Sequence, residues 1–333
     1  MAVSKNEKLQ WKKAGIWFMK VVALAGGVGG AKLTDGLVRS SSSPDLTVIV
    51  NTGDDFSLYG LKISPDLDTV CYTLAGIEGP ETGWGRADET WETLEELQKL
   101  GGPDWFSLGN RDLATHLERT RRLGLGESLS GVTADFIKTW GVGADVIPMS
   151  DDPVPTTVLT DQGELAFQEY FVRSACEPAV SGFTYQGAEH AQPAPGIVRA
   201  IKSADLIVIC PSNPWVSIGP ILAVPGIRSA LEEKTVMAIS PIIGGKAVKG
   251  PAAKMYQEMG ISPSAAAVAH HYGELLDGFV IDEQDHQLRN EIERISAKSL
   301  KVLCTDTWMK TREDRVRLAD EVLNFGQRLL KED

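Results

Sequence analysis

Two groups of carboxylates have the residue types and spacing that metal or phosphate chemistry needs. Asp54 and Asp55 end the segment 47–55, and Asp66 and Asp68 lie two residues apart in the segment 63–70. Carboxylate oxygens suit Mg²⁺, which usually takes one or two of them together with substrate phosphates and water. The spacing of Asp66 and Asp68 allows both to face one cation. A structural turn at 51–55, and an N-cap role for Asp66 or Asp68, are the alternatives.

A glycine-rich turn is the second such feature. It follows an apolar run, precedes a helical pattern and contains Gly26, Gly27, Gly29, Gly30 and Lys32. Glycines at the start of a helix let backbone amides approach a phosphate at the positive end of the helix dipole. The motif is neither a P-loop nor a complete dinucleotide fingerprint, because Lys32 occupies the place of the third glycine. We predict phosphate or nucleotide contact, with a tight strand-to-helix turn as the alternative.

Two later loops have a similar composition. The segments 211–220 and 240–251 each follow an apolar run and combine small donors with prolines and glycines. Such residues form rigid turns at a sheet edge and allow a ligand to approach the backbone. Lys246 and Lys249 add positive charge to the second loop. We expect nucleotide contact from Ser212, Asn213, Ser217 and Gly244.

The segment 107–116 places polar side chains at the start of a helical pattern. Ser107 precedes the pattern, and Arg111 lies in its first turn. A guanidinium group can bind a phosphate or carboxylate through two parallel hydrogen bonds. The alternative is a solvent-facing turn in which Arg111 pairs with a neighbouring acid. His116, taken by itself, is more typical of a structural histidine than of a catalyst.

An α/β fold must position these residues. Seven short aliphatic runs read as strands buried on both faces, and helical patterns lie between them. This alternation predicts a doubly wound, mostly parallel, Rossmann-like sheet. The predicted strands are 21–25, 47–50, 145–148, 206–210, 235–240, 278–281 and 301–305.

Three further segments complete the predicted organisation. Residues 1–20 are expected to be a flexible leader before a single domain at 21–333. The stretch from about 81 to 140 has helical patterns without a convincing strand, and we expect it to form an insertion that covers the active site. Residues 170–192 read as a second, loop-rich excursion. The last helix is expected to start after Thr311, with Asp314 completing its capping pattern.

Composition limits the possible functions. The 333 residues carry a net charge of −12, which argues against nucleic-acid binding, because such binding needs a basic surface. The four cysteines lie far apart, so reduced thiols are expected, not a zinc site or a disulfide framework. The apolar run before residue 26 is interrupted by Lys20 and suits neither a membrane span nor a secretory signal. We expect a cytoplasmic enzyme without a membrane partner.

Several of these motifs, in the same order, resemble the CofD family, whose actinobacterial members are called FbiA. The resemblance runs from about residue 21 to the C-terminus. Its most specific parts are the segments 63–70, 149–154, 211–214, 217–220 and 240–244. The family comprises the 2-phospho-L-lactate transferases of coenzyme F420 biosynthesis.

The resemblance implies a Mg²⁺-dependent transfer. The acceptor is the terminal hydroxyl of the deazaflavin Fo, the donor is a guanylylated phospholactate or its enolpyruvyl counterpart, and GMP leaves. It also implies that Asp55, Asp66 and Asp68 hold Mg²⁺ or orient the hydroxyl. The family's deazaflavin contacts correspond to Asp68 and Ser107. Relatives can carry a basic side chain at the latter position, and Arg111 is a candidate to supply that charge.

Two other functions are weighed against this one. A YvcK-type regulator shares the glycine turn and binds nucleotide sugars without catalysis. A nicotinamide-dependent dehydrogenase would use a similar fold, but the incomplete fingerprint weakens it. The sequence does not choose between the two donors, and a homodimer is expected as the commonest oligomer.

Overall fold

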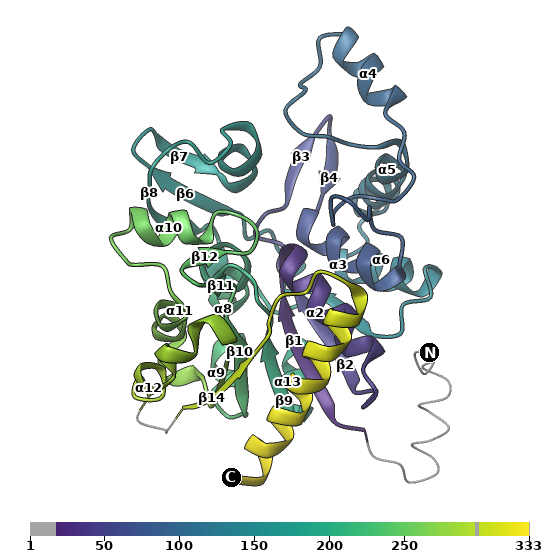
Figure 1. Cartoon of the computed structure of the whole chain (residues 1–333). Coiled ribbons are helices and arrows are strands. Elements are labelled where there is room, and N and C mark those ends of the chain that lie inside the picture. The colour runs from purple at the N-terminus through teal and green to yellow at the C-terminus, as the bar shows by residue number, and fades with distance from the viewer. Residues whose placement is uncertain (1–17, 297–299, 333) are drawn as a thin grey trace.

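A seven-stranded parallel sheet forms the centre of the molecule (Figure 1). The computed structural model describes residues 18–296 and 300–332, so the predicted leader at 1–20 lies almost entirely outside the described residues. The strand order is β14-β13-β10-β9-β1-β2-β5, and every neighbouring pair is parallel. The strands are β1 (Lys20–Ala25), β2 (Asp45–Val50), β5 (Asp145–Pro148), β9 (Leu206–Ile209), β10 (Val236–Ile239), β13 (Gly278–Asp282) and β14 (Lys301–Thr305). The seven predicted strands are confirmed to within two residues at each end.

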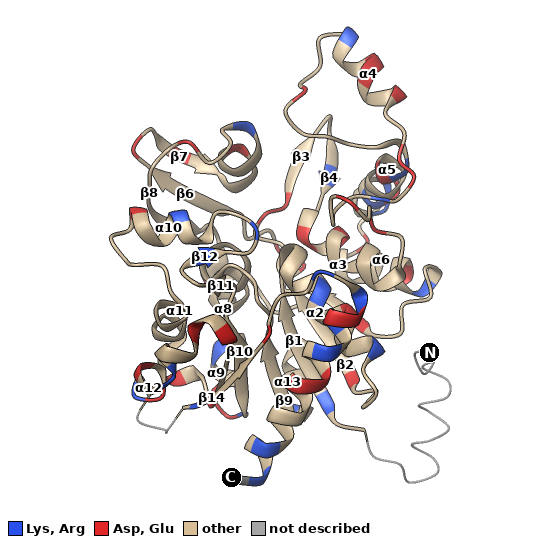
Figure 2. Cartoon of the chain, in the orientation of Figure 1, with Lys and Arg blue, Asp and Glu red and all other residues tan. Residues whose placement is uncertain are grey.

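Helices cover both faces of the sheet, which confirms the doubly wound α/β class. Successive residues of β1 alternate between two cores: Val21 packs with α2 (Gly27–Arg39) and α13 (Arg312–Glu332), whereas Val22 packs with α7 (Ile197–Ser203). This alternation is the consequence of the two-residue period of a strand. The central strands carry few charges, and acidic and basic residues are distributed over the surrounding elements (Figure 2). Other helices that pack on these faces include α3 (Pro65–Ala75), α8 (Gly219–Ala223), α9 (Ile227–Leu231), α11 (Ala265–Tyr272) and α12 (Arg289–Ile292).

The direction of chain progression reverses beside β1. From β1 the chain moves to β2 and β5 on one side, and it later returns to β9 on the other side. The carboxyl ends of the neighbouring strands β1 and β9 therefore form a topological switch point, because the chain leaves these strands toward opposite edges of the sheet. Ligands bind at such points in open α/β sheets. This topology brings the glycine turn and the 211–217 loop together.

A first excursion rises from the carboxyl ends of the strands after β2. It begins with the hairpin β3 (Phe56–Leu58) and β4 (Leu61–Ile63) and, after α3, continues into α4 (Glu92–Lys99), α5 (Asn110–Gly124) and α6 (Leu129–Thr139). Only part of it approaches the site: α4 lies at the far end of the arm in Figure 1, and Leu94 is its one buried residue.

A second excursion stands opposite the first one in Figure 1. It contains an antiparallel sheet of β6 (Thr156–Thr160), β7 (Gly163–Ala166) and β8 (Val180–Tyr185), and α10 (Ala252–Glu258) lies beside it. The expectation of a loop-rich segment at 170–192 is corrected here, because β8 and a π-helical turn at Glu169–Arg173 occupy much of it. The β-branched run Thr156–Thr160, followed by turn residues at 161–163, was the signal for the missed hairpin.

The C-terminal helix is capped as predicted. Asp314 accepts hydrogen bonds from the amide of Thr311 at 2.8 Å, and the Thr311 hydroxyl accepts one from the amide of Asp314 at 3.2 Å. Along the helix, Leu318 and Val322 join the core that α13 shares with α2. A Cβ on Gly36 of α2 would lie 2.1 Å from the carbonyl oxygen of Arg315, so only glycine allows this close approach.

Candidate functional site

A cleft of about 550 Å³ opens at the switch point, between the two excursions. Its size falls within the range of small-molecule sites. Five groups of described residues line it: the glycine turn, acids after β2 and in α3, the 211–217 loop, the 240–252 loop, and side chains of both excursions. The lining includes Gly26, Gly27, Gly29, Lys32, Asp54, Asp66, Asp68, Ser107, Asp112, His116, Ser212, Asn213, Ser217 and Lys249.

The glycines of the first turn are required by close packing. Gly27 has a φ of +61°, which favours glycine. A Cβ on Gly29 would lie 2.2 Å from the carbonyl oxygen of Pro211, and one on Gly30 would lie 2.9 Å from the Ser212 hydroxyl. The alternative of a tight strand-to-helix turn is therefore part of the observed structure, because these glycines admit the neighbouring loop.

Ser212 and Asn213 organise that neighbouring loop. The hydroxyl of Ser212 donates to the Gly26 carbonyl at 2.8 Å and accepts from the Gly26 amide at 3.3 Å. The side-chain oxygen of Asn213 accepts from the amides of Trp215 and Val216. The bonds of Ser212 fix the loops after β1 and β9 relative to each other, and those of Asn213 shape the second loop.

Two carboxylates face each other beside the glycine turn. The side-chain amide of Asn51 donates to Asp66 at 2.9 Å and lies 3.5 Å from Asp54, which also accepts from Gln168 at 3.1 Å. Burial, with the neighbouring charges of Asp66 and Asp55, raises the pKa of Asp54 well above its ordinary value. Burial also raises the pKa of Asp66 to about 6, although hydrogen bonds from Asn51 and the Gly27 amide act in the opposite direction.

Asp55 differs from its neighbour Asp54 in its surroundings. It accepts a hydrogen bond from the Ser64 hydroxyl at 2.7 Å, and burial raises its pKa well above the ordinary value. Its Oδ1 atom is buried and has no hydrogen-bond partner among the described residues. Among those residues the cleft lining includes Asp54 and not Asp55, so the acid that reaches the cleft is one residue earlier than predicted.

Asp66 and Asp68 point in different directions, contrary to the expectation that both could face one cation. They lie two residues apart in the first turn of α3, and such positions lie on different sides of a helix. Asp66 faces the glycine turn, whereas Asp68 pairs with Arg119 of α5. Neither acid is the N-cap of α3, which is Ser64.

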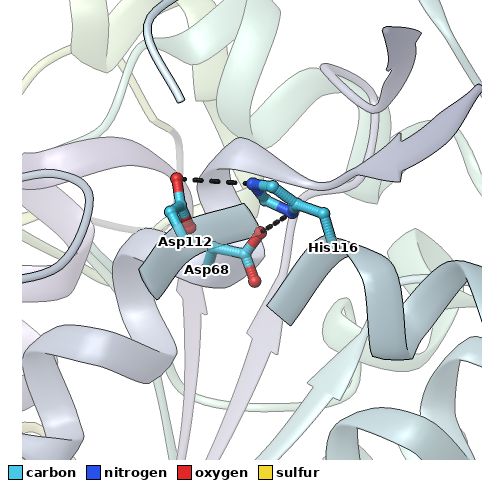
Figure 3. Close-up of side chains that lie close together, drawn as sticks. All are labelled: Asp68, Asp112 and His116. Atoms are coloured by element: carbon cyan, nitrogen blue, oxygen red, sulfur yellow. Dashed lines mark ion pairs between the residues drawn. The ribbon is translucent and has the colours of Figure 1, made fainter. Parts of the chain in front are cut away.

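Asp68 belongs to a buried charge cluster between α3 and α5. Its carboxylate accepts hydrogen bonds from both terminal nitrogens of Arg119, one of them at 2.9 Å. The imidazole of His116 lies between two acids, with Nδ1 3.7 Å from Asp68 and Nε2 3.3 Å from Asp112 (Figure 3). In the described part of the chain these three residues are the only His, Cys, Asp or Glu group with three ligand atoms within 4.8 Å. The positive charge of Arg119, which pairs with Asp68, disfavours binding of a metal ion to this group.

The lysines of the cleft contact backbone carbonyls. Lys32 donates to Met309 at 2.8 Å, and Lys249 donates to Thr82 at 2.6 Å. Burial, with the nearby charges of Arg315 and Lys249, lowers the pKa of Lys32, and burial lowers that of Lys249. Among the described residues that line the cleft, these two are the ones that are Lys or Arg.

Of three residues predicted to contact a ligand, Ser107 lines the cleft, whereas Arg111 and Gly244 lie outside the described lining. Ser107 lines the cleft at an exposed position. Arg111 is exposed and outside the described lining, because its guanidinium bonds to the Ala87 carbonyl at 3.0 Å and pairs with Asp88. Gly244 also lies outside that lining, since its amide donates to Asp285 at 3.0 Å. Its neighbours Ser240 and Ile243 face the cleft instead.

Sequence reasoning missed several lining residues. Phe167, Gln168 and Phe171 come from the second excursion, where no strand was predicted. Thr307 and Trp308 follow β14, so the rule that ligands meet the carboxyl ends of strands could have found them. Arg119 had no signal, because its partner lies 51 residues away.

The fold and cleft define a class: an open α/β protein with a phosphate-compatible glycine turn and carboxylates at the switch point. The model of the family described as "2-phospho-L-lactate transferase CofD" matches residues 21–322, and the chain belongs to this family.

Relatives agree with this assignment. A phosphoenolpyruvate transferase of Streptomyces griseus is 48% identical over 316 residues, covering 91% of this chain and 99% of its own length. A phosphoenolpyruvate transferase of Mycolicibacterium smegmatis is 43% identical, covering 86% of this chain and 94% of its own. A Bacillus halodurans member of the UPF0052 family shares the fold, with a TM-score of 0.59, 15% identity, and coverage of 93% of this chain and 100% of its own. No helix within the described residues combines the length and apolar character that a bilayer crossing needs.

Proposed function

We propose that this enzyme transfers an enolpyruvyl phosphate or 2-phospholactyl group from a guanylylated donor to the terminal hydroxyl of Fo, in coenzyme F420 biosynthesis. The observation that carries the proposal is the convergence of the glycine turn, the 211–217 loop and the acids in one cleft of a CofD-family chain. The relatives are named for phosphoenolpyruvate, so the enolpyruvyl donor is the one we propose, with dehydro-F420-0 as product.

The reaction is a substitution at phosphorus. The hydroxyl oxygen of Fo forms a bond to the phosphorus that bears the acid, and the bond from that phosphorus to the bridging oxygen breaks. GMP leaves with the electron pair, and the hydroxyl proton is released to water. Enzymes accelerate such transfers mainly by positioning the reactants and offsetting the developing charge.

The two sides of the cleft suit the two substrates. The glycine turn, Ser212 and Ser217 face the part of the cleft that also contains Lys32 and Lys249, and we assign the guanylyl phosphates to this side. Phe106, Phe167 and Phe171 supply aromatic surface from the two excursions, and we assign the planar deazaflavin to them. Asp68 lines the same cleft and is assigned to the attacking hydroxyl.

The acids fit a magnesium ion. Asp54, Asp55 and Asp66 are mutually repelling carboxylates with raised pKa values, and Asp55 has a buried oxygen without a hydrogen-bond partner in the described residues. A divalent cation relieves this repulsion, and two carboxylates with substrate phosphates form a usual magnesium site. We assign the ion to Asp54 and Asp66, which line the cleft. When bound, Mg²⁺ offsets negative charge on the diphosphate.

The regulator remains the alternative against which the transferase is tested. The family match and the names of the relatives support the transferase, and neither supports a nucleotide-sugar regulator. Incubation of the protein with Fo, Mg²⁺ and each guanylylated donor, followed by mass analysis, tests the proposal. We expect a deazaflavin phosphodiester and GMP in equal amounts. Binding of Fo or donor without product from either donor would contradict it.

A further inference from the structure

The buried cluster beneath Asp68 contains groups that the proposed reaction does not yet use. Arg119 is 2% exposed, His116 is 1% exposed, and both come from the same face of α5. Asp68 comes from α3, which packs on the central sheet. The ion pair of Asp68 and Arg119 therefore joins an element of the sheet layer to an element of the first excursion.

The contacts in this cluster form a continuous chain. The hydroxyl of Tyr72 donates to Asp112 at 2.7 Å, and Asp112 lies 3.3 Å from Nε2 of His116. One terminal nitrogen of Arg119 lies 3.3 Å from Nδ1 of His116 and donates to Asp68 at 2.9 Å. Each side chain in this series contacts the next one. The series ends at the carboxylate of Asp68, which lines the cleft.

Two features separate this arrangement from an ordinary structural ion pair. Both oxygens of Asp68 contact Arg119, which fixes the plane of the carboxylate as well as its position. A carboxylate has about four lone-pair sites, so the sites not directed at Arg119 remain for a hydrogen-bond donor in the cleft. The guanidinium also offsets the charge of Asp68, which reduces repulsion of an anionic donor.

We propose that Arg119 is a positioning residue for the transfer: it holds Asp68 in the orientation in which that carboxylate accepts a hydrogen bond from the attacking hydroxyl. His116 and Asp112 in turn fix the guanidinium. This inference rests on the proposed function, because it needs Asp68 to meet the acceptor. It concerns residues whose contacts are with other side chains and not with the reacting atoms.

The test compares Arg119→Gln with Arg315→Gln in steady-state assays with Fo and the enolpyruvyl donor. Arg315 is a matched control, because it is also largely buried, pairs with Asp35 at 2.9 Å and is not itself among the described residues that line the cleft. We expect Arg119→Gln to lower kcat about 100-fold, the effect of misplacing a reacting group by about 1 Å, with KM values within about threefold. Arg315→Gln is expected to lower the melting temperature without changing kcat.

Rescue separates positioning from folding. Arg119→Ala leaves a space beside Asp68 and His116, which line the cleft, so added guanidinium can reach it. We expect guanidinium to raise kcat of Arg119→Ala at least about tenfold, whereas sodium at equal ionic strength does not, because only guanidinium restores the paired hydrogen bonds.

Several outcomes would overturn the inference. A folded Arg119→Gln protein with wild-type kcat would do so, as would an equal loss of kcat in Arg315→Gln. If Arg119→Gln does not fold, His116→Asn decides: a tenfold or larger loss of kcat at constant KM supports positioning, and unchanged kcat overturns it. Failure of the wild-type protein to form product would contradict the proposed function instead, so the two failures are distinguishable.

Discussion

The two walls of the cleft are built by different means. On the sheet side, backbone groups and small side chains meet: Gly29 lies against Pro211, and the Ser212 hydroxyl bonds twice to Gly26. On the side of the first excursion, buried charges meet, with Asp68 and Arg119 at the centre. Added side-chain atoms would clash in the first wall, whereas loss of one partner would leave a buried unpaired charge in the second.

This difference suggests separate tasks for the two walls: donor binding for the glycine wall and the transfer step for the charged wall. Backbone amides at a helix start can hold the phosphates of many ligands, and related sheets use such turns for many purposes. In the proposed reaction, a carboxylate fixed by a buried guanidinium meets one particular atom of the acceptor. We therefore expect changes in the charged wall to lower kcat and changes in the glycine wall to raise KM of the donor.

The largest effect is expected for Asp68→Asn. Loss of the carboxylate removes the acceptor for the attacking hydroxyl and leaves Arg119 without its charge partner, so we expect kcat to fall about 10³-fold and stability to fall by about 3 kcal/mol. Steady-state kinetics and urea unfolding measure the two effects. Asp135→Asn is the control, because Asp135 makes an exposed ion pair with Arg122. A folded Asp68→Asn protein with normal turnover would remove Asp68 from the mechanism.

Gly29→Ala is expected to have the next largest effect, and it tests the other wall. Its Cβ would lie 2.2 Å from the Pro211 carbonyl oxygen, so the two loops must separate. We expect KM of the donor to rise about tenfold and stability to fall by about 1–3 kcal/mol. Gly124→Ala is the control, because no atom lies within 4 Å of its Cβ position. A fall in kcat at constant KM would contradict the division between the walls.

A smaller, pH-dependent effect is expected from Asp66. Its pKa is raised from 3.8 to about 6, so the folded protein binds the proton more tightly than the unfolded chain. The contribution of Asp66 to stability is therefore full below pH 3.8 and is lost as the pH rises through about 6. Thermal unfolding of the wild type and of Asp66→Asn without metal measures the difference. We expect the advantage of Asp66→Asn to grow by a few degrees across this window, and Mg²⁺ to cancel it above pH 6. A difference that does not change with pH would contradict the shift.

The smallest effect is expected for Lys249→Gln. The ammonium lies in the cleft lining and bonds to the Thr82 carbonyl at 2.6 Å, so its loss removes positive charge from the donor side. We expect KM of the donor to rise about fivefold, the effect of one lost hydrogen bond of about 1 kcal/mol, with kcat unchanged. Lys246→Gln is the matched control from the same loop, because Lys246 is exposed and outside the described lining. Equal effects of the two substitutions would indicate general electrostatics.

The sheet could be predicted from the sequence because its strands are buried on both faces. The run Val236–Ile239 is fully buried in the structure. Its continuous apolar composition is typical of a strand that is covered on both faces. The hairpin of β6 and β7 was missed because three of the four residues of β7 are exposed, and its first residues, Gly163 and Glu164, carry no strand signal.

The site was predictable only where local sequence determines it. The glycine turn and Ser212 follow strands, and the edge rule places them together. The direction of Asp66 and Asp68 depends on where α3 begins, and the partner of Asp68 depends on how α5 packs. Arg111 was proposed because it lies in the first turn of the helix, but burial decides which guanidinium reaches the acid, and that residue is Arg119.

The glycine at position 36 has a consequence for synthesis. The helix that starts with the phosphate-compatible turn is covered by the last helix of the chain, and Gly36 admits the backbone of Arg315 at this contact. During translation the N-terminal turn leaves the ribosome long before its covering helix does. The face of α2 that carries Gly36 therefore stays uncovered until α13 has emerged, and a nascent chain without α13 lacks the packing partner of the helix that begins with the glycine turn.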